Sequence, residues 1–267
     1  MHPLFFPSFD KSAAPAVICM LAHADPAEAI PTVRAAAAHR PAGYGFQLEQ
    51  VPPELRTEER LGKLFAAMEG APVYATSYRH SRNEGKSDEV LADELLSLCD
   101  RGASLIDVMG DLYDRTPGEL TRSPAAIRRQ ETLIAEIHRG GAQVLMSSHV
   151  LKYTPAEQVL DIARAQQARG ADMVKVVTAA DTPEEEAEAF RITSLLHREL
   201  SVPFLFLCGG SHCRRHRHLN FAFGCPIVLS VQAYTALSTP TQPPLPLMRS
   251  LCDLLAPVHL PETPDVS

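Results

Sequence analysis

The chain has 267 residues, of which 45% are apolar and 21% charged, and its formal net charge is −7. Such a composition is typical of a globular protein with a sizeable buried core rather than of a disordered chain. The acidic balance argues against a nucleic-acid binder, which usually carries a basic face, although a local cluster of arginines can still bind a small anion. No stretch approaches the roughly 20 apolar residues of a membrane-spanning helix, so no membrane association is expected.

Short apolar stretches alternate with longer amphipathic ones, a pattern that predicts strands alternating with helices. The first apolar run, Ala13–Ala22, contains the stretch Ala16–Leu21, follows Lys11 and Ser12, and superficially resembles a signal peptide. Asp10 just upstream and Pro15 within the apolar run favour a buried first strand instead. The other strands are expected at Gly45–Val51, Pro72–Ser77, Ser104–Val108, Gln143–Ser147, Asp172–Val177, Pro203–Cys208 and Pro226–Val231.

Helices are expected between these strands, and two of them have clear start signals. Thr154 and Thr182 are placed as N-caps, each followed by a proline at the first helical position. The helix Asp88–Cys99 should bury an apolar side made of Val90, Leu91, Leu95, Leu96 and Leu98. The other helices are expected at Pro26–His39, Glu58–Met68, Pro124–His138, Pro155–Gln167, from Pro183 onward, in a short segment after Cys208, and at Leu245–Leu255.

Eight strands, each followed by a helix, fit the roughly 250 residues of a (β/α)8 barrel, and we expect one such domain over 1–267 with a core of about 16–255. Phe204–Leu207 is continuously apolar, as parallel strands buried on both faces are. No GxGxxG or P-loop motif favours an open sheet. The first dozen residues and the tail from Pro257 are expected to be peripheral.

The six cysteines include no CxxC pair, which favours free thiols in a reducing cytoplasm. Cys208, Cys213 and the neighbouring histidines could suggest a metal site, but their spacing fits no zinc pattern. We therefore expect no metal.

Lys175 and His149 lie at neighbouring strands of the expected barrel. Lys175 stands inside the apolar strand Asp172–Val177, and His149 follows the strand before it. A lysine there can extend its ammonium to water, and a loop histidine can be idle. In a desolvated lumen near other cations, a neutral lysine amine can instead attack a ketone, and the imine then acts as an electron sink for carbanion chemistry. Histidine is the usual base for the α-proton.

The same region resembles the type I 3-dehydroquinate dehydratase family. The resemblance rests on Leu145–His149, with its Ser-x-His ending, on Tyr153-Thr-Pro, and on the Gly-Ala-Asp-x-x-Lys sequence of Gly170–Lys175. It extends from about Ala16 to Leu255 and is strongest in the second half. It implies that Lys175 is the Schiff-base lysine and His149 the general base and acid.

Further positions match the family's site residues. Arg79 resembles the arginine that ends strand three, and Glu84, one residue farther along than usual, the glutamate that supports the histidine. Arg217 lies at the spacing of the arginine that binds the substrate carboxylate. Ser238 and Gln242 match the Ser-x-Pro-x-Gln loop that closes over substrate, where the alternative is an ordinary turn. Arg214 and Arg215 are expected in a solvated loop.

Strand two departs from the family pattern. Where the family has Glu-x-Arg-x-Asp to contact ring hydroxyls, this chain has Gln47, Glu49 and Val51. On strand four, the family's Asp-x-Glu is Asp107-Val-Met109. The imine-forming pair is therefore kept while part of the hydroxyl-binding set, now represented by Gln47 and Glu49, is changed.

The resemblance implies dehydration of 3-dehydroquinate, an anionic hydroxyketone acid, to 3-dehydroshikimate in the shikimate pathway. No metal or organic cofactor is expected, because the lysine supplies the electron sink. Dimers among family members suggest a homodimer, and the cysteine spacing remains the basis for expecting a cytoplasmic protein. Two alternatives stay open: a Schiff-base lyase or aldolase of the same fold for another hydroxyketone, and a catalytically weak relative with a binding role.

Overall fold

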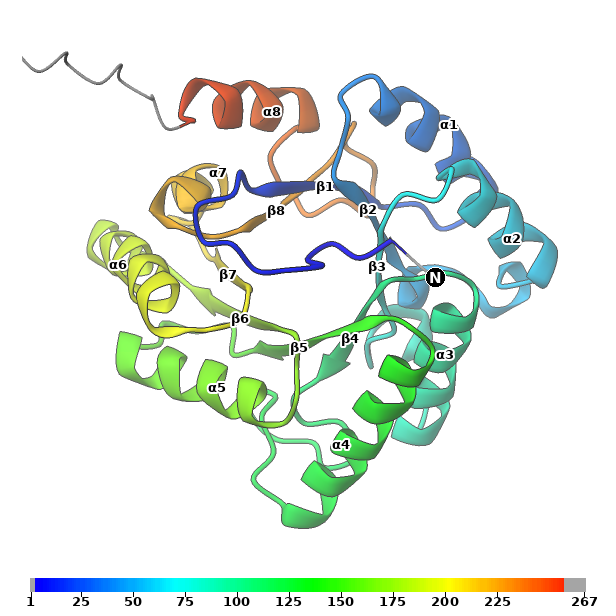
Figure 1. Ribbon diagram of the computed structural model, residues 1–267, viewed down its shortest axis with the longest axis horizontal. Helices are drawn as coiled ribbons and strands as arrows, with labels where there is room; N and C mark the ends of the chain where they lie inside the picture. Colours follow the sequence, from blue (N-terminus) through cyan, green and yellow to red (C-terminus); the bar gives the residue numbers. More distant parts are fainter. Residues whose placement is uncertain (1–2, 257–267) are drawn as a thin grey trace, which may run out of the picture.

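The computed structural model describes residues 3–256, in which eight parallel strands form a nearly closed barrel surrounded by helices (Figure 1). The strands are β1 (Ala16–Leu21), β2 (Gly43–Gln47), β3 (Val73–Thr76), β4 (Leu105–Met109), β5 (Gln143–His149), β6 (Met173–Ala179), β7 (Phe204–Gly209) and β8 (Ile227–Ser230). The α-helices are α1 (Pro26–Ala37), α2 (Glu58–Ala67), α3 (Asp88–Asp100), α4 (Pro124–Arg139), α5 (Ala156–Ala168), α6 (Pro183–Glu199), α7 (Arg214–Leu219) and α8 (Leu245–Leu254). The predicted (β/α)8 fold is confirmed.

The strands hydrogen-bond in the order β7-β6-β5-β4-β3-β2-β1-β8, so β7 and β8 are the two ends of the ladder. Every pairing in this ladder is parallel, and the register sets Ser147 of β5 beside Lys175 of β6. Parallel pairing brings all carboxyl ends of the strands to one rim, where barrel enzymes place their active sites. The carboxyl ends of β5 and β6 therefore lie side by side at this rim.

Local signals placed most boundaries, with three corrections. Thr182 caps α6 as predicted, since its side chain accepts a hydrogen bond from the Glu185 amide. At α5 the cap position is taken by Pro155, and the Thr154 hydroxyl donates to the Lys152 carbonyl instead. The predicted second strand was placed too late: β2 ends at Gln47, and Leu48–Gln50 form a short 3-10 helix, η1. Arg214 and Arg215, expected in a loop, begin α7.

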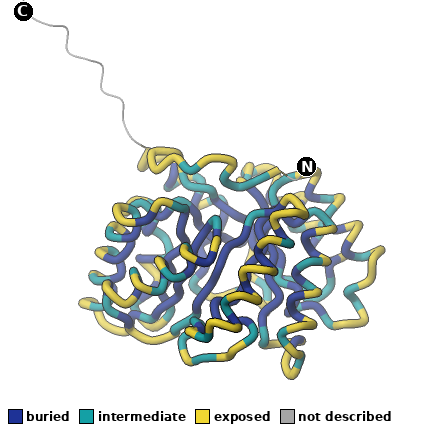
Figure 2. Tube along the Cα trace, turned by 60° about the horizontal axis from the view of Figure 1, so that its bottom comes forward, coloured by how far each residue is buried: buried dark blue, intermediate teal, exposed yellow. Residues whose placement is uncertain are grey.

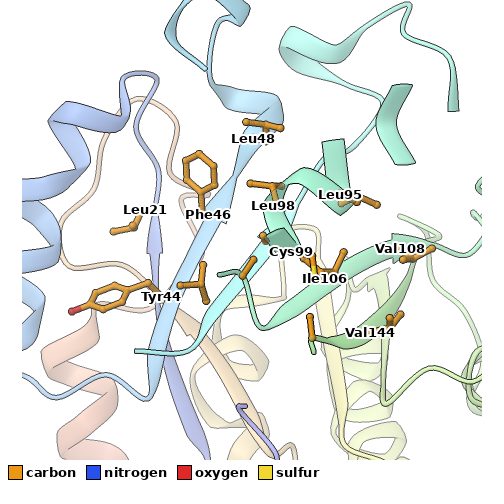
Figure 3. Packing of buried hydrophobic residues seen from close by; sticks show 14 of the residues in the cluster. Leu21, Tyr44, Phe46, Leu48, Leu95, Leu98, Cys99, Ile106, Val108 and Val144 are labelled. Atoms are coloured by element: carbon orange, nitrogen blue, oxygen red, sulfur yellow. The ribbon is translucent and has the colours of Figure 1, made fainter. Parts of the chain in front are cut away.

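The main hydrophobic core fills the layer between the outer faces of the strands and the helices. Figure 3 shows Phe46 of β2, Ile106 of β4, and Leu98 and Cys99 of α3 within one cluster. The predicted apolar side of α3 is largely correct, except that Val90 is 44% exposed. In Figure 2 buried stretches run through the interior while exposed ones lie on the outside. All six cysteines are buried and unpaired.

The N-terminal segment lies across the amino ends of the strands. The Phe5 ring lies next to Gly43 at the start of β2, where a Cβ would come within 2.5 Å of it. The Gln143 side chain, at the start of β5, donates to the Phe6 carbonyl at 2.8 Å. Phe5 and Phe6 therefore pack under the barrel at this end, and we call this short segment the N-terminal floor. The tail expected from Pro257 lies outside the described residues. Within residues 3–256, no helix combines the length and apolar character needed to cross a membrane.

Candidate active site

A hollow of about 280 Å³ opens at the carboxyl rim of the barrel. It brings together five of the predicted site residues, listed here: Lys175, His149, Gln47, Arg217 and Gln242. Its apolar lining includes Met20 of β1, Leu207 of β7 and Leu229 of β8. Because these residues come from strands on all sides of the barrel, the hollow is the open end of the lumen itself.

Lys175 is buried at the base of this hollow, with 5% of its surface exposed. Its Nζ lies 2.7 Å from the Tyr78 hydroxyl, 3.0 Å from the Tyr74 hydroxyl and 3.3 Å from Oδ2 of Asp107. The sequence allowed two environments for this amine, bulk water or a desolvated lumen near other cations. In the structure it is buried, and none of the groups that contact it directly is a cation. Two phenols and a carboxylate surround it.

Asp107 is the centre of this buried cluster. Its carboxylate accepts hydrogen bonds from Tyr74 at 2.6 Å, from Tyr78, and from Ser147 at 2.5 Å. Burial and then the charge of Asp107 raise the pKa of both tyrosines well above its ordinary value. Both phenols are therefore protonated near neutral pH and act as hydrogen-bond donors.

His149 ends β5 and is held by Glu119 from the loop between β4 and α4. One oxygen of Glu119 lies 2.7 Å from Nδ1 of His149 and also accepts from the His149 amide at 3.0 Å. Burial alone would raise the pKa of the Glu119 carboxyl, but the hydrogen bonds and charge of His149 outweigh it and lower the pKa. With Nδ1–H donated to this carboxylate, Nε2 is left as the basic nitrogen. Nε2 has no hydrogen-bond partner among residues 3–256.

Glu84 does not take the position expected from the sequence. It follows the 3-10 helix η3 (Ser81–Asn83) and is exposed. No hydrogen bond or ion pair joins it to His149 within the described part of the chain, where Glu119 makes that contact. The correction follows from the fold of the loop after β3, which turns Asn83 inward and Glu84 outward.

The two strand-two residues have different positions. Gln47 lines the hollow. Glu49 is fully buried behind it, where it accepts hydrogen bonds from the Thr76 hydroxyl at 2.9 Å and from the Gln47 amide at 3.2 Å. Burial raises the pKa of Glu49. Glu49 therefore fixes Gln47 and β3 rather than lining the hollow, and its charge does not face a bound molecule.

Arg217 and Gln242 form the opposite wall. The Arg217 Nε donates to the Cys208 carbonyl at 2.7 Å, and burial lowers the pKa of its guanidinium. Its other N–H groups make no hydrogen bond within residues 3–256, so they can bind an anion. Ser238 does not line the hollow: its hydroxyl accepts from the Thr235 amide at 2.9 Å, while Thr239 takes the lining position.

Arg79 lines a second hollow of about 400 Å³ that shares Tyr78 and His149 with the first. Its guanidinium is bound to Asp88 at 2.7 Å and to Asp111 at 2.5 Å. Burial alone would lower its pKa, but these hydrogen bonds and charges raise it. Arg79 therefore organises the loops beside His149 and lies outside the hollow of Lys175.

Sequence reasoning missed Tyr74, Tyr78 and Glu119, and gave Asp107, the retained part of the strand-four motif, no role. Alternation along β3 could have found Tyr74, since it shares the lumen face with Thr76. Asp107 inside an apolar strand is a similar signal. Glu119 lies in a loop without periodicity, so no pattern indicates it. No group of three or more His, Cys, Asp or Glu in residues 3–256 is arranged to hold a metal ion.

Comparison with known proteins adds the family. The family model "Type I 3-dehydroquinase" matches residues 47–257. A 3-dehydroquinate dehydratase of Klebsiella pneumoniae is 26% identical over 198 residues, which cover 73% of this chain and 74% of that protein. The bifunctional chloroplastic 3-dehydroquinate dehydratase/shikimate dehydrogenase of Arabidopsis thaliana is 34% identical over 117 residues, covering 43% of this chain and 18% of that protein.

Solved structures agree in fold. The 3-dehydroquinate dehydratase of Geobacillus kaustophilus superposes with a TM-score of 0.74 at 17% identity, covering 90% of this chain and 91% of that one. The type I enzyme of Clostridium difficile, solved with covalently modified comenic acid, gives 0.75 at 14% identity, covering 91% and 93%. The resemblance found in the sequence is confirmed by the family match: this chain belongs to the Type I 3-dehydroquinase family.

Proposed function

We propose that this protein is a 3-dehydroquinate dehydratase that acts through a Schiff base on Lys175. One observation carries the proposal: a buried lysine amine lies at the base of a hollow that His149 and Arg217 also line. An amine, a base and a cation that face one hollow match a substrate that has a ketone, an acidic α-proton and a carboxylate.

In the proposed reaction the Lys175 nitrogen condenses with the ketone and releases water. The protonated imine withdraws electrons from the neighbouring carbon and so lowers the barrier to loss of its proton. Nε2 of His149 takes that proton, and the imidazolium then gives it to the departing hydroxyl group. Glu119 keeps the ring in the tautomer that accepts at Nε2 and stabilises its charged form. Hydrolysis of the imine frees Lys175.

In this proposal the substrate is bound mainly by the wall that contains Arg217 and Gln242. The free N–H groups of Arg217 are suited to the carboxylate, since guanidinium–carboxylate pairs form strong bidentate hydrogen bonds. Gln242 and Gln47 offer amide groups to the remaining oxygens. Ser238 and Arg79, which the family comparison suggested as further contacts, would act from outside this hollow, through the loop at Thr235 and through Asp111.

The test is chemical trapping. The protein is incubated with 3-dehydroquinate and borohydride, and peptides are analysed by mass spectrometry for a reduced adduct on Lys175. The exposed Lys152 serves as the internal control, because a non-specific amine reaction would label it as well. The proposal requires an adduct on Lys175 together with growth of conjugated-enone absorbance in the absence of borohydride. A folded protein that yields neither is not a 3-dehydroquinate dehydratase.

The altered strand-two motif favours a second candidate, in which the same imine chemistry acts on another hydroxyketone acid. Gln47 presents a neutral amide at the wall, and the buried Glu49 leaves no arginine there. A site without this arginine has one fewer charged donor for ring hydroxyl groups. Borohydride trapping with a panel of small 2-keto and 3-keto hydroxy acids separates the two candidates, since the second requires an adduct with one of these and none with 3-dehydroquinate.

A further inference from the structure

The proposed reaction leaves open which group handles the protons of Lys175 itself. An imine forms only after the lysine nitrogen has lost two protons, and the ketone oxygen must gain two to leave as water. No hydrogen bond joins Lys175 to His149 among the described residues, and Nδ1 of His149 is engaged by Glu119. The groups that do contact Nζ are the buried cluster of Tyr74, Tyr78 and Asp107.

Tyr78 is the member of this cluster best placed to reach a bound ketone. Its hydroxyl makes the shortest contact to Nζ, at 2.7 Å, and also donates to Asp107. Its ring packs edge-on against His149 with 5.1 Å between ring centroids, and it lines both hollows at the rim. Tyr74 lines only the first hollow and lies within β3, whereas Tyr78 follows the carboxyl end of that strand.

We propose that Tyr78, backed by Asp107, is a catalytic residue that carries protons between the Lys175 nitrogen and the ketone oxygen while the imine forms and while it is hydrolysed. The proposal rests on the Schiff-base function above. Each pair then has its own proton transfers. The Tyr78–Asp107 pair transfers protons at the Lys175 nitrogen and the ketone oxygen, and the His149–Glu119 pair transfers the proton of the α-carbon to the departing hydroxyl group.

The proton and electron count closes within these groups. The Lys175 ammonium gives one proton to Asp107, directly or through Tyr78, and its freed electron pair forms the C–N bond while the C=O π pair moves to oxygen. That oxygen takes a proton from Tyr78, which regains one from Asp107. A second proton follows the same route from nitrogen to the new hydroxyl. The C–O bond then breaks, water leaves with its electron pair, and the nitrogen lone pair forms the C=N bond. The total charge is unchanged.

The environment suits this role. The raised pKa of the Tyr78 phenol keeps it protonated, so it passes protons on as a hydrogen-bonded relay and is not lost as a phenolate. Ser147 holds the other oxygen of Asp107 at 2.5 Å, which fixes the carboxylate while Oδ2 faces the two phenols and Nζ. A positioned acid–base group typically contributes roughly 10²- to 10⁴-fold in rate.

The experiment measures how fast the imine forms, separately from the later steps. Wild-type protein and the variants Tyr78→Phe and Asp107→Asn are mixed with 3-dehydroquinate, quenched with borohydride at increasing times, and the Lys175 adduct is quantified by mass spectrometry. We expect both variants to form it at least about 10²-fold more slowly. His149→Asn should form it at close to the wild-type rate and yet fail to exchange the α-proton with deuterated solvent.

Two controls give the result its meaning. Tyr44→Phe removes a hydroxyl from another buried tyrosine, outside the lumen, and should not alter the rate. Unfolding temperatures identify any variant that fails to fold, and Asp107→Asn, which keeps the side-chain shape, then stands in for Tyr78→Phe. Equal rates for wild type and a folded Tyr78→Phe overturn the relay while leaving the Schiff base intact. If the wild type gives no adduct, both proposals fall together.

Discussion

The two walls of the hollow are built differently. The wall from β3 to β6 carries the groups that are proposed to react, and its polar atoms form continuous networks: Lys175 with the Asp107 cluster, and His149 with Glu119. On the wall from β7 round to β2, the polar groups are held singly. Arg217 is anchored through one N–H to the Cys208 carbonyl, and Gln47 through one contact to Glu49.

This difference predicts at which positions a side-chain substitution is tolerated. Groups in a connected buried network cannot be exchanged one at a time, because each loss leaves a buried partner unsatisfied. A singly held group at the rim can change with a smaller local cost. Gln47, one departure from the family at strand two, is such a singly held group. Glu49 is instead buried in contact with Thr76, and Met109, the departure at strand four, lies on a strand of the first wall. We therefore expect substitutions in the connected networks to lower activity more than substitutions of singly held groups, and four predictions test that comparison.

The largest effect is expected for Lys175→Ala. If this lysine is the nucleophile, turnover should fall at least about 10⁴-fold, because removing a covalent nucleophile eliminates the imine route altogether. Lys152→Ala, at an exposed lysine in the loop after β5, is the matched control and should behave as wild type. Steady-state assays of enone formation measure both. An active Lys175→Ala variant would contradict the role given to the first wall.

Glu119→Gln should lower kcat by about 10²-fold with little change in KM, since the amide no longer stabilises an imidazolium at His149. Glu84→Gln, at the exposed glutamate suggested by the family pattern, should leave both constants unchanged. The pair of variants decides which glutamate orients the base. The reverse result would restore Glu84 and discard Glu119.

Arg217→Met should act mainly on KM. Loss of a charge-assisted hydrogen bond costs about 1.5–3 kcal/mol, which corresponds to a roughly 10- to 100-fold rise in KM. Arg214→Met, at an exposed position of the same helix, is the control. A fall in kcat with KM unchanged would mean that this wall contributes to the chemical step, and the contrast between the walls would weaken.

Glu49 should produce the smallest effect, on stability and its pH dependence. Burial raises its pKa above the ordinary 4.5, so the folded protein binds a proton more readily than the unfolded chain. The contribution of this group to the free energy of unfolding therefore falls as pH rises from about 4.5 through the folded pKa, and is constant above it.

Glu49→Gln removes this titration. We expect its free energy of unfolding, measured in urea from about pH 4.5 to about pH 8, to decline less steeply than that of the wild type. The difference between the two curves isolates Glu49 from other titrating groups. Parallel curves would show that the Glu49 carboxyl is not buried as described. Its charge would then have to be counted among the groups that face the hollow.

Much of this molecule could be predicted from the sequence, and the exceptions share a physical cause. Periodicity and helix caps located the eight βα units, and the strand ends placed Lys175 and His149 at one rim. Such signals are local. The position of Glu119 is set by how a loop without periodicity packs on β5, and the burial of Glu49 by contacts with Thr76 across a neighbouring strand. Tertiary contacts decide these positions, and no window of sequence contains them.

The N-terminal floor under the barrel has a consequence for traffic through the site. Phe5 and Phe6 lie at the amino ends of β2 and β5, and they pack against the buried cluster that contains Leu105 and Leu145. The barrel is therefore a tube with one closed end. In the proposed reaction, substrate would enter by the same opening through which the ring product and the released water leave, so each turnover would have to empty the hollow before the next molecule binds.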